Sequence, residues 1–175
     1  MVRLVKASLE APAGLQELLE QLGDGENGFV GTGQMPNTQS LATYLRSLVD
    51  MDLGIILRPG WVPMTTHWLL DDAGVVAGVS RLRHRLTPEL LNDGGNIGYY
   101  IRPAYRGKGH GKAILALTLI EARKLGLERV LLTVRIGNQP SIRVIETNNG
   151  VLEDERTDPE GFPYRRYWID LTGGG

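Results

Sequence analysis

The sequence predicts a single α+β domain built on a central mixed, mostly antiparallel sheet with helices on both faces. Two observations lead to this fold class. The first is a β-hairpin, since two extended segments flank the turn sequence Asp-Asp-Ala-Gly at 71–74. The second is a strand, a long helix and a strand at 96–102, 109–125 and 130–134, an order that normally gives a parallel pair with a right-handed crossover. A sheet with both kinds of pairing buries its apolar surface under packed helices.

Residue periodicity predicts the elements one by one. Apolar residues three or four positions apart indicate helices, whereas alternation or a β-branched run indicates strands. The glycines at 23 and 126 suit the ends of two helices. In chain order we expect a strand at 2–6, a helix at 13–22, a mobile loop at 23–37, a helix at 40–49, strands at 66–71, 74–82 and 96–102, a helix at 109–125, a strand at 130–134, a helix at 141–147 and a strand at 164–171.

Composition narrows the function. The 175 residues form one domain, 1–175, with 42 % hydrophobic and 22 % charged residues, which is typical of a globular protein. A net charge of -1 argues against nucleic-acid binding. The absence of cysteine excludes disulfides, thiolate metal sites and a catalytic thiol, and the three histidines lack ligand spacing, so we expect no metal.

The sequence also lacks membrane and export signals. No run approaches the roughly 18 apolar residues of a membrane helix, and the first residues lack the apolar core of a secretion signal. We therefore expect a cytoplasmic protein that does not associate with membranes.

The segment 106–112 carries the strongest chemical signal. Its sequence, Arg-Gly-Lys-Gly-His-Gly-Lys, lies between a predicted strand and the start of an apolar helix. Glycines let the backbone approach a ligand closely, and the helix start offers unpaired N–H groups that suit an anion. Arg106, Lys108 and Lys112 add positive charge. The segment is typical of a diphosphate-binding loop, and a glycine-rich turn with solvated basic residues is the alternative.

Two well-known phosphate loops do not fit this segment. A Walker loop needs Ser or Thr after Gly-Lys, where Ala113 stands, and the spacing back to Gly107 is one residue short. A dinucleotide fingerprint starting at Gly107 needs glycine at position 112, which is Lys112.

A third family does fit. Arg106-x-x-Gly109-x-Gly111 resembles the Arg/Gln-x-x-Gly-x-Gly/Ala signature of the GNAT superfamily of acetyl-CoA-dependent N-acetyltransferases. The resemblance covers element order over 65–171 and is specific over 96–150, and the stretch 82–103 is similar to a bacterial subgroup without an assigned acceptor. It implies an acetyl-CoA-binding core at 96–150 and an acceptor-side region at 1–64.

The resemblance implies a role for each residue of the site. The main-chain N–H groups of the loop would hold the diphosphate, and the N–H of Ile101 would polarise the thioester carbonyl. Asn138 would bond the pantetheine arm, although Asn is also a preferred N-cap residue. Ser141 is either a further contact or a helix-start residue. The implied acetyl-CoA-binding residues are Ile101, Arg106, Gly107, Lys108, Gly109, His110, Gly111, Lys112, Asn138 and Ser141.

The acceptor side offers weaker candidates. His84 would remove the amine proton or would be a hydrogen-bonded structural residue. Tyr99 alternates with Tyr100 on a strand, so one of them faces the core and the other is a candidate catalytic residue. Trp61 and Trp68 would wall an acceptor pocket or belong to the core.

One departure from the family concerns the leaving group. Many members carry a tyrosine seven residues after the motif asparagine as the acid that protonates the CoA thiolate, and here that position is Ile145. A carboxylate common on the preceding strand is replaced by Thr133. Catalysis would then lean on positioning and on the Ile101 N–H.

These observations predict an enzyme that acetylates a primary amine of a small molecule or peptide by direct attack in a ternary complex. Transfer of a longer acyl chain and acetylation of protein N-termini are alternative activities. A non-catalytic acyl-CoA sensor is an alternative from another class. Partners other than the amine are not predicted, and a homodimer is left open.

Overall fold

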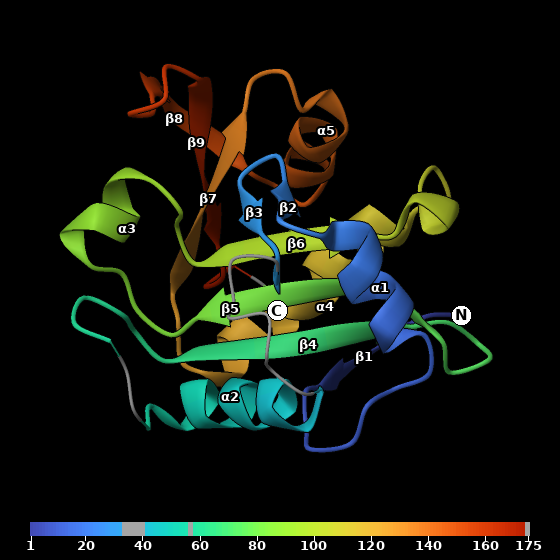
Figure 1. The fold of residues 1–175 in the computed structure, drawn as a ribbon. Coiled ribbons are helices and arrows are strands. Elements are labelled where there is room, and N and C mark those ends of the chain that lie inside the picture. Colours follow the sequence, from blue (N-terminus) through green and yellow to red (C-terminus); the bar gives the residue numbers. More distant parts are fainter. Residues whose placement is uncertain (33–40, 56–57, 174–175) are drawn as a thin grey trace.

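The computed structural model describes residues 1–32, 41–55 and 58–173 (Figure 1). Residues 33–37 of the expected loop and residue 40 of the expected helix therefore lie outside the described part. The strands and helices, in chain order, are β1 (Arg3–Lys6), α1 (Leu15–Leu22), β2 (Gly25–Glu26), β3 (Phe29–Val30), α2 (Leu41–Leu53), β4 (Met64–Leu70), β5 (Val76–Arg83), α3 (Pro88–Asn92), β6 (Ile97–Ile101), the 3-10 helix η2 (Pro103–Tyr105), α4 (His110–Lys124), β7 (Arg129–Arg135), α5 (Gln139–Thr147), β8 (Val151–Thr157) and β9 (Pro163–Asp170).

The strands form two main sheets, and the predicted fold class is confirmed. The first sheet has the order β1-β4-β5-β6, and every neighbouring pair is antiparallel. The second has the order β7-β9-β8, again antiparallel. Its long strands rise steeply from the first sheet in Figure 1.

The two sheets meet at Asn96 rather than through the expected parallel ladder. The Asn96 N–H donates to the carbonyl of Leu131, and its side-chain oxygen accepts from the N–H of Leu131, at 2.7 and 2.9 Å. Gly95 brings the chains this close, because a Cβ there would lie 2.3 Å from the Leu131 oxygen, and its φ of +61° favours glycine. Strands β6 and β7 then diverge and belong to different sheets. This divergence leaves one edge of β6 without a strand partner among the described residues.

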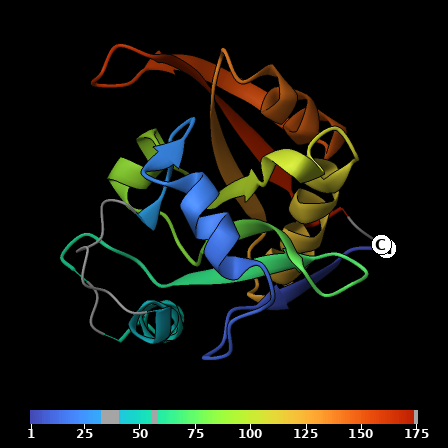
Figure 2. The same ribbon diagram turned by 45° about the vertical axis from the view of Figure 1, so that its right-hand side comes forward.

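Helices cover both faces of the first sheet, as predicted. Helices α1 and α2 bury Leu18 and Leu45 against Trp68 and Tyr100 on one face. On the other face, Leu115 of α4 packs with residues of β5, β6, β7 and α5. Figure 2 shows α4 and α5 side by side, away from α1 and α2. The start of α4 and the free edge of β6 therefore lie on the same side of the molecule.

Strands β2, β3 and β8 and the short helices α3 and η2 were not predicted from the sequence. The expected loop at 23–37 contains the small β2–β3 hairpin, and α3 occupies the polar stretch after β5. Strand β8 has charged residues at most positions and lacks the alternation typical of a strand. It is held by ion pairs with β9, in which Arg166 bonds Glu153 and Asp154 at 2.5 and 3.0 Å. Such cross-strand pairs cannot be recognised until both strands are aligned.

Candidate active site

The predicted diphosphate loop connects η2 to the start of α4. Gly107 and Gly109 have φ of +72° and +82°, and no atom would lie within 4 Å of a Cβ at either position. Gly109 is the N-cap residue of α4 and provides no side-chain cap, so the first-turn N–H groups have no intrahelical partner. These N–H groups carry the positive end of the helix dipole. The loop can therefore bind an anion through its main chain.

The cationic side chains of this loop differ in their availability. Arg106 is committed to protein contacts, since it bonds both carboxylate oxygens of Glu26 at 3.1 and 2.6 Å and the Ile101 carbonyl at 2.9 Å. The Glu26 carboxylate raises the pKa of Arg106. Lys108 donates to the Ala104 carbonyl at 2.9 Å. Lys112 is exposed and, within the described residues, its ammonium group has no ion pair or hydrogen bond.

His110 has a structural contact as well. Its Nδ1 lies 2.8 Å from the Tyr105 carbonyl oxygen, which can only accept, so the nitrogen carries the proton. The imidazole also meets the Tyr105 ring edge-on, with centroids 5.7 Å apart. His110 thus fastens the loop to η2.

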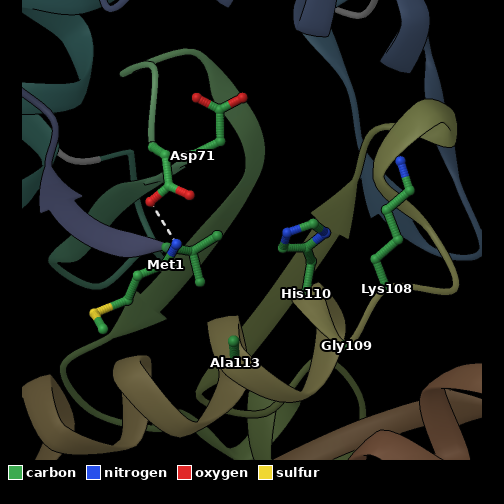
Figure 3. Close-up of a pocket in the computed structure, with 8 residues that line it drawn as sticks. Met1, Asp71, Lys108, Gly109, His110 and Ala113 are labelled. Atoms are coloured by element: carbon green, nitrogen blue, oxygen red, sulfur yellow. Dashed lines mark hydrogen bonds and ion pairs between the residues drawn. The ribbon is translucent and has the colours of Figure 1, made fainter.

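A pocket of about 270 Å³ adjoins the loop on the side of β1 and the β4–β5 turn. Figure 3 shows Lys108, Gly109 and His110 on one side of it and Asp71 opposite, and Asp72 completes that acidic wall. The amino group of Met1 pairs with Asp72 there. Two carboxylates repel a phosphate, so this pocket is a poor diphosphate site.

The free edge of β6 presents main-chain groups next to this loop. Arg102 donates to Ala77 and Arg83 donates to Asn96, and alternate residues between them make the bonds to β5. Ile101 belongs to the other set, so its N–H points away from β5 toward the divergence of β6 and β7. The Ile101 carbonyl on that edge is already bonded to Arg106. The N–H therefore remains a donor that a thioester carbonyl can use.

Tyr99 projects from β6 toward the start of α5. Its hydroxyl is buried, lies close to Ser141 and makes no hydrogen bond of regular geometry among the described residues. Burial raises the pKa of Tyr99 to about 12, an effect that the nearby Ser141 opposes. A buried hydroxyl without a partner is costly unless a ligand satisfies it. Tyr99 thus places a buried hydroxyl, without a regular hydrogen bond among the described residues, beside Ser141 at the start of α5.

Asn138 and Ser141 begin helix α5. Asn138 is the N-cap residue, and its side-chain oxygen accepts from the Ser141 N–H at 3.4 Å, which is the structural role expected of such an asparagine. Gly111 on α4 faces this helix closely, since a Cβ at Gly111 would lie 3.2 Å from Val144. The two helices therefore pack against each other near the start of α4.

The two departures from the family pattern have different structural outcomes. Ile145, which replaces the tyrosine, is 2 % exposed and belongs to the hydrophobic core, so this position does not face the ligand. Thr133, however, donates to the Asp93 carboxylate at 3.2 Å and accepts from the Gly94 N–H at 3.1 Å. A carboxylate thus lies beside this position, supplied by the loop after α3. Sequence spacing alone did not suggest Asp93.

The structure does not bring His84 to the loop. Its Nε2 lies 2.7 Å from the Thr65 hydroxyl, which also bonds Asp52 at 2.5 Å, and Lys6 bonds the other Asp52 oxygen at 2.5 Å. Burial lowers the pKa of His84, and the Asp52 carboxylate opposes this effect. This network borders the C-terminal end of α4, roughly 20 Å from its first residue at 1.5 Å per residue. His84 fits the structural alternative.

The aromatic candidates separate into core and surface. Trp68 is 1 % exposed and packs with α1 and α2, and Tyr100 shares that cluster. Trp61 is 48 % exposed and lies under the guanidinium group of Arg58 at 5.1 Å. Of these three residues, Trp61 is the one with a surface that a ligand can reach.

Two further properties bear on function. In residues 1–32, 41–55 and 58–173, no three His, Asp or Glu side chains gather in a way that could hold a metal ion. No helix of this part of the chain has the length and apolar character needed to cross a bilayer.

Comparison with known proteins identifies the fold and the family. No curated protein matches the chain in sequence. Among solved structures, a GNAT-family acetyltransferase of Streptococcus pneumoniae is 15 % identical with a TM-score of 0.68, over 97 % of this chain and 99 % of that one. An N-acetyltransferase of Staphylococcus aureus is also 15 % identical, with a TM-score of 0.67 and coverage of 98 % and 99 %. The protein yncA of Salmonella typhimurium, solved with acetyl-CoA, is 16 % identical with a TM-score of 0.65 and coverage of 99 % and 96 %.

The family assignment agrees with the sequence motif and with the arrangement of β6, the glycine loop and α4. The model of the acetyltransferase (GNAT) family matches residues 53–150, which is more than half of the chain. The chain belongs to the GNAT family of acetyltransferases.

Proposed function

We propose that the protein transfers the acetyl group of acetyl-CoA to a primary amine of a small molecule or peptide, by direct attack in a ternary complex. One observation carries the proposal: the free edge of β6 opens beside the glycine loop, so the Ile101 N–H and the first-turn N–H groups of α4 are unused donors at one end of one strand. The helix start suits the diphosphate of CoA, and the Ile101 N–H suits the thioester carbonyl. Lys112, whose ammonium group has no partner in the described part of the chain, supplies a positive charge near the diphosphate.

The reaction needs one bond made and one broken. The amine nitrogen attacks the thioester carbonyl carbon, the oxygen becomes negative, and collapse expels the CoA sulfur with its bonding electrons. The Ile101 N–H stabilises the negative oxygen as it forms. The proton lost by the amine passes to water. Holding both reactants in place can lower the barrier by roughly 7 kcal/mol, so a dedicated base is not required.

Tyr99 is our candidate for the hydrogen-bond donor to the departing CoA sulfur, which then takes its proton from water. It remains protonated at neutral pH, because burial raises its pKa to about 12, and its hydroxyl has no regular hydrogen bond among the described residues. It borders α5, the helix on which many family members place their tyrosine and on which this chain has Ile145. In this proposal a strand residue supplies the phenol that the helix lacks.

A second candidate function is a non-catalytic acyl-CoA sensor, which the buried Ile145 favours. The two functions are separated by incubating the protein with acetyl-CoA and a panel of primary amines and by following free CoA thiol. We expect thiol release that depends on the amine. Tight CoA binding by calorimetry without thiol release for any amine would favour the sensor.

Substitution of Tyr99 tests its role in the same assay. We expect Tyr99→Phe to lower kcat by about tenfold, less than a typical acid contributes because the CoA thiolate is a stable leaving group, and to leave KM for acetyl-CoA unchanged. Tyr167→Phe is the matched control, since Tyr167 is buried in the adjoining core and its hydroxyl bonds Glu146 at 3.0 Å. Equal kcat values for the two variants would remove Tyr99 from the reaction.

A further inference from the structure

Two arginines of β5 lie next to each other on the face of the sheet away from α4. Ser80 bonds Thr118 of α4 at 2.8 Å, so the even-numbered residues of this part of β5 face α4. Arg81 and Arg83 alternate with them and face the opposite side. Arg81 contacts the β2–β3 hairpin there, donating to the Val30 carbonyl at 2.7 Å. This is the side that also carries α1 and α2.

The contacts of this arginine pair are with neutral groups. Arg81 lies 4.2 Å from the centroid of the Phe29 ring, and Arg83 donates to the carbonyls of Gly94 and Gly95 at 3.3 and 3.1 Å. Within the described residues, no carboxylate comes within ion-pair distance of either guanidinium group. Asp93 acts on Arg83 only from farther away, as a partner that raises its pKa.

Holding these two charges together is costly. Burial lowers the pKa of both groups, and repulsion from Arg81 lowers that of Arg83 further. A guanidinium group nevertheless stays charged at any pH of interest. A partly buried charge without a counterion is stabilised when an anion pairs with it. The pair therefore favours a ligand that brings a negative group.

The register of the sheet relates this pair to the proposed transfer site. Arg81 is paired with Gly98 on β6, and Ile101 lies three residues farther along that strand, about 10 Å away. An amino acid or short peptide, together with the reach of an arginine side chain, spans such a distance. The anion bound by the arginines and an amine near the Ile101 N–H can thus belong to one molecule.

We propose that the acceptor is an amine that also carries a carboxylate, an amino acid or a short peptide, and that Arg81 and Arg83 bind this carboxylate. The inference rests on the proposed acetyl transfer and specifies its acceptor. Arginine suits this role because its planar fork matches both oxygens of a carboxylate.

The first test compares acceptors that differ only in this charge. The panel consists of the free amino acids and their C-terminal primary amides, assayed for thiol release at saturating acetyl-CoA. We expect kcat/KM to be about 10- to 100-fold higher for the acid than for the amide of the preferred side chain, since a charge-assisted hydrogen bond is lost with the amide. Equal kcat/KM for acids and amides would overturn the inference and leave acetyl transfer standing.

The second test removes the arginines singly. Arg81→Gln and Arg83→Gln should raise KM for the acid by about 10- to 100-fold and abolish the preference over the amide, while CoA affinity by calorimetry stays unchanged. Arg85→Gln is the matched control, because Arg85 is exposed two residues farther along the chain. Arg81→Lys keeps the charge without the planar fork and should give an intermediate KM. That result would show that the higher KM of Arg81→Gln is not caused by unfolding. Preservation of the acid preference in both glutamine variants would overturn the assignment. Transfer to other primary amines but to no amino acid or amide would overturn the inference alone, and transfer to no primary amine at all would overturn the proposed function as well.

Discussion

The two ends of helix α4 both gather polar residues, but those residues are used differently. At the N-terminal end, the amides around Gly109 have no protein partner and Lys112 has no ion pair within the described residues. At the C-terminal end, His84, Thr65 and Asp52 complete one another's hydrogen bonds. We propose that the first end binds the ligand and that the second end has a structural role. From residue type alone, His84 would have been the candidate catalytic residue.

The largest effect should come from Gly109→Val. We expect it to weaken CoA binding at least 100-fold, about 3 kcal/mol, because a branched side chain disfavours the φ of +82° and stands beside the donor N–H groups. Gly126→Val is the control at the other end, with a φ of +81° and equally open surroundings. Both variants should lose similar stability, and only the first should lose CoA affinity in calorimetry. Equal CoA affinities in the two variants would sink the loop assignment.

The second prediction concerns His67, which lines the cavity at the C-terminal end of α4. Burial lowers its pKa from 6.5 to about 4, although the carboxylates of Glu121 and Asp52 oppose this. The unfolded chain therefore takes up a proton between these pH values before the folded chain does. The contribution of the neutral His67 is complete above pH 6.5 and is lost as the pH falls toward 4, by roughly 3 kcal/mol.

Urea unfolding of the wild type and of His67→Gln between pH 7 and 4.5 measures this contribution. The free energy of unfolding should fall less steeply with decreasing pH in the variant. His110→Gln retains His67 and should follow the wild-type slope. Identical slopes in all three proteins would contradict a depressed pKa for His67.

The third prediction is for His84→Ala. Loss of the bond to Thr65 should lower the free energy of unfolding by about 1–2 kcal/mol. Turnover at saturating acetyl-CoA should change less than about twofold, and its pH profile should keep its shape, since a structural histidine takes no proton from the amine. Burial lowers the pKa of His84, so a base role would show as a rise of turnover with pH below the usual histidine range. A large fall in turnover, with loss of that rise, would make His84 the base and contradict the contrast between the two ends of α4.

The smallest effect is expected for Lys112→Ala. One exposed cation near a phosphate contributes about 1 kcal/mol, so CoA affinity should fall about fivefold. Lys124→Ala is the control, because Lys124 lies in the last turn of the same helix and pairs with Glu121 at 2.8 Å. An equal change in both variants would mean that Lys112 acts only through the net charge of the protein.

Much of the fold followed from local patterns. The hairpin at 71–74, the strand before the loop and the long helix after it all lie where periodicity and glycine positions predict them. Strand β8 was missed because its stability comes from Arg166 and other partners on β9. The expected parallel pairing of β6 and β7 was wrong, again because it depends on contacts between distant segments. Asn96 joins the two strands at one point, and they then separate.

The candidate site, too, could be predicted from the sequence only where its features depend on neighbouring residues. The glycines of 106–112 predict a loop of special conformation from sequence, because φ preferences and helix capping act between neighbouring residues. The sequence could not show that His84 lies far from that loop or that Tyr99 borders α5. Nor could it show that Arg81 and Arg83 share one face where, in the described part of the chain, no carboxylate pairs with them. Those properties depend on which distant groups the sheet register brings within hydrogen-bond range, and a partner tens of residues away leaves no mark in the local pattern.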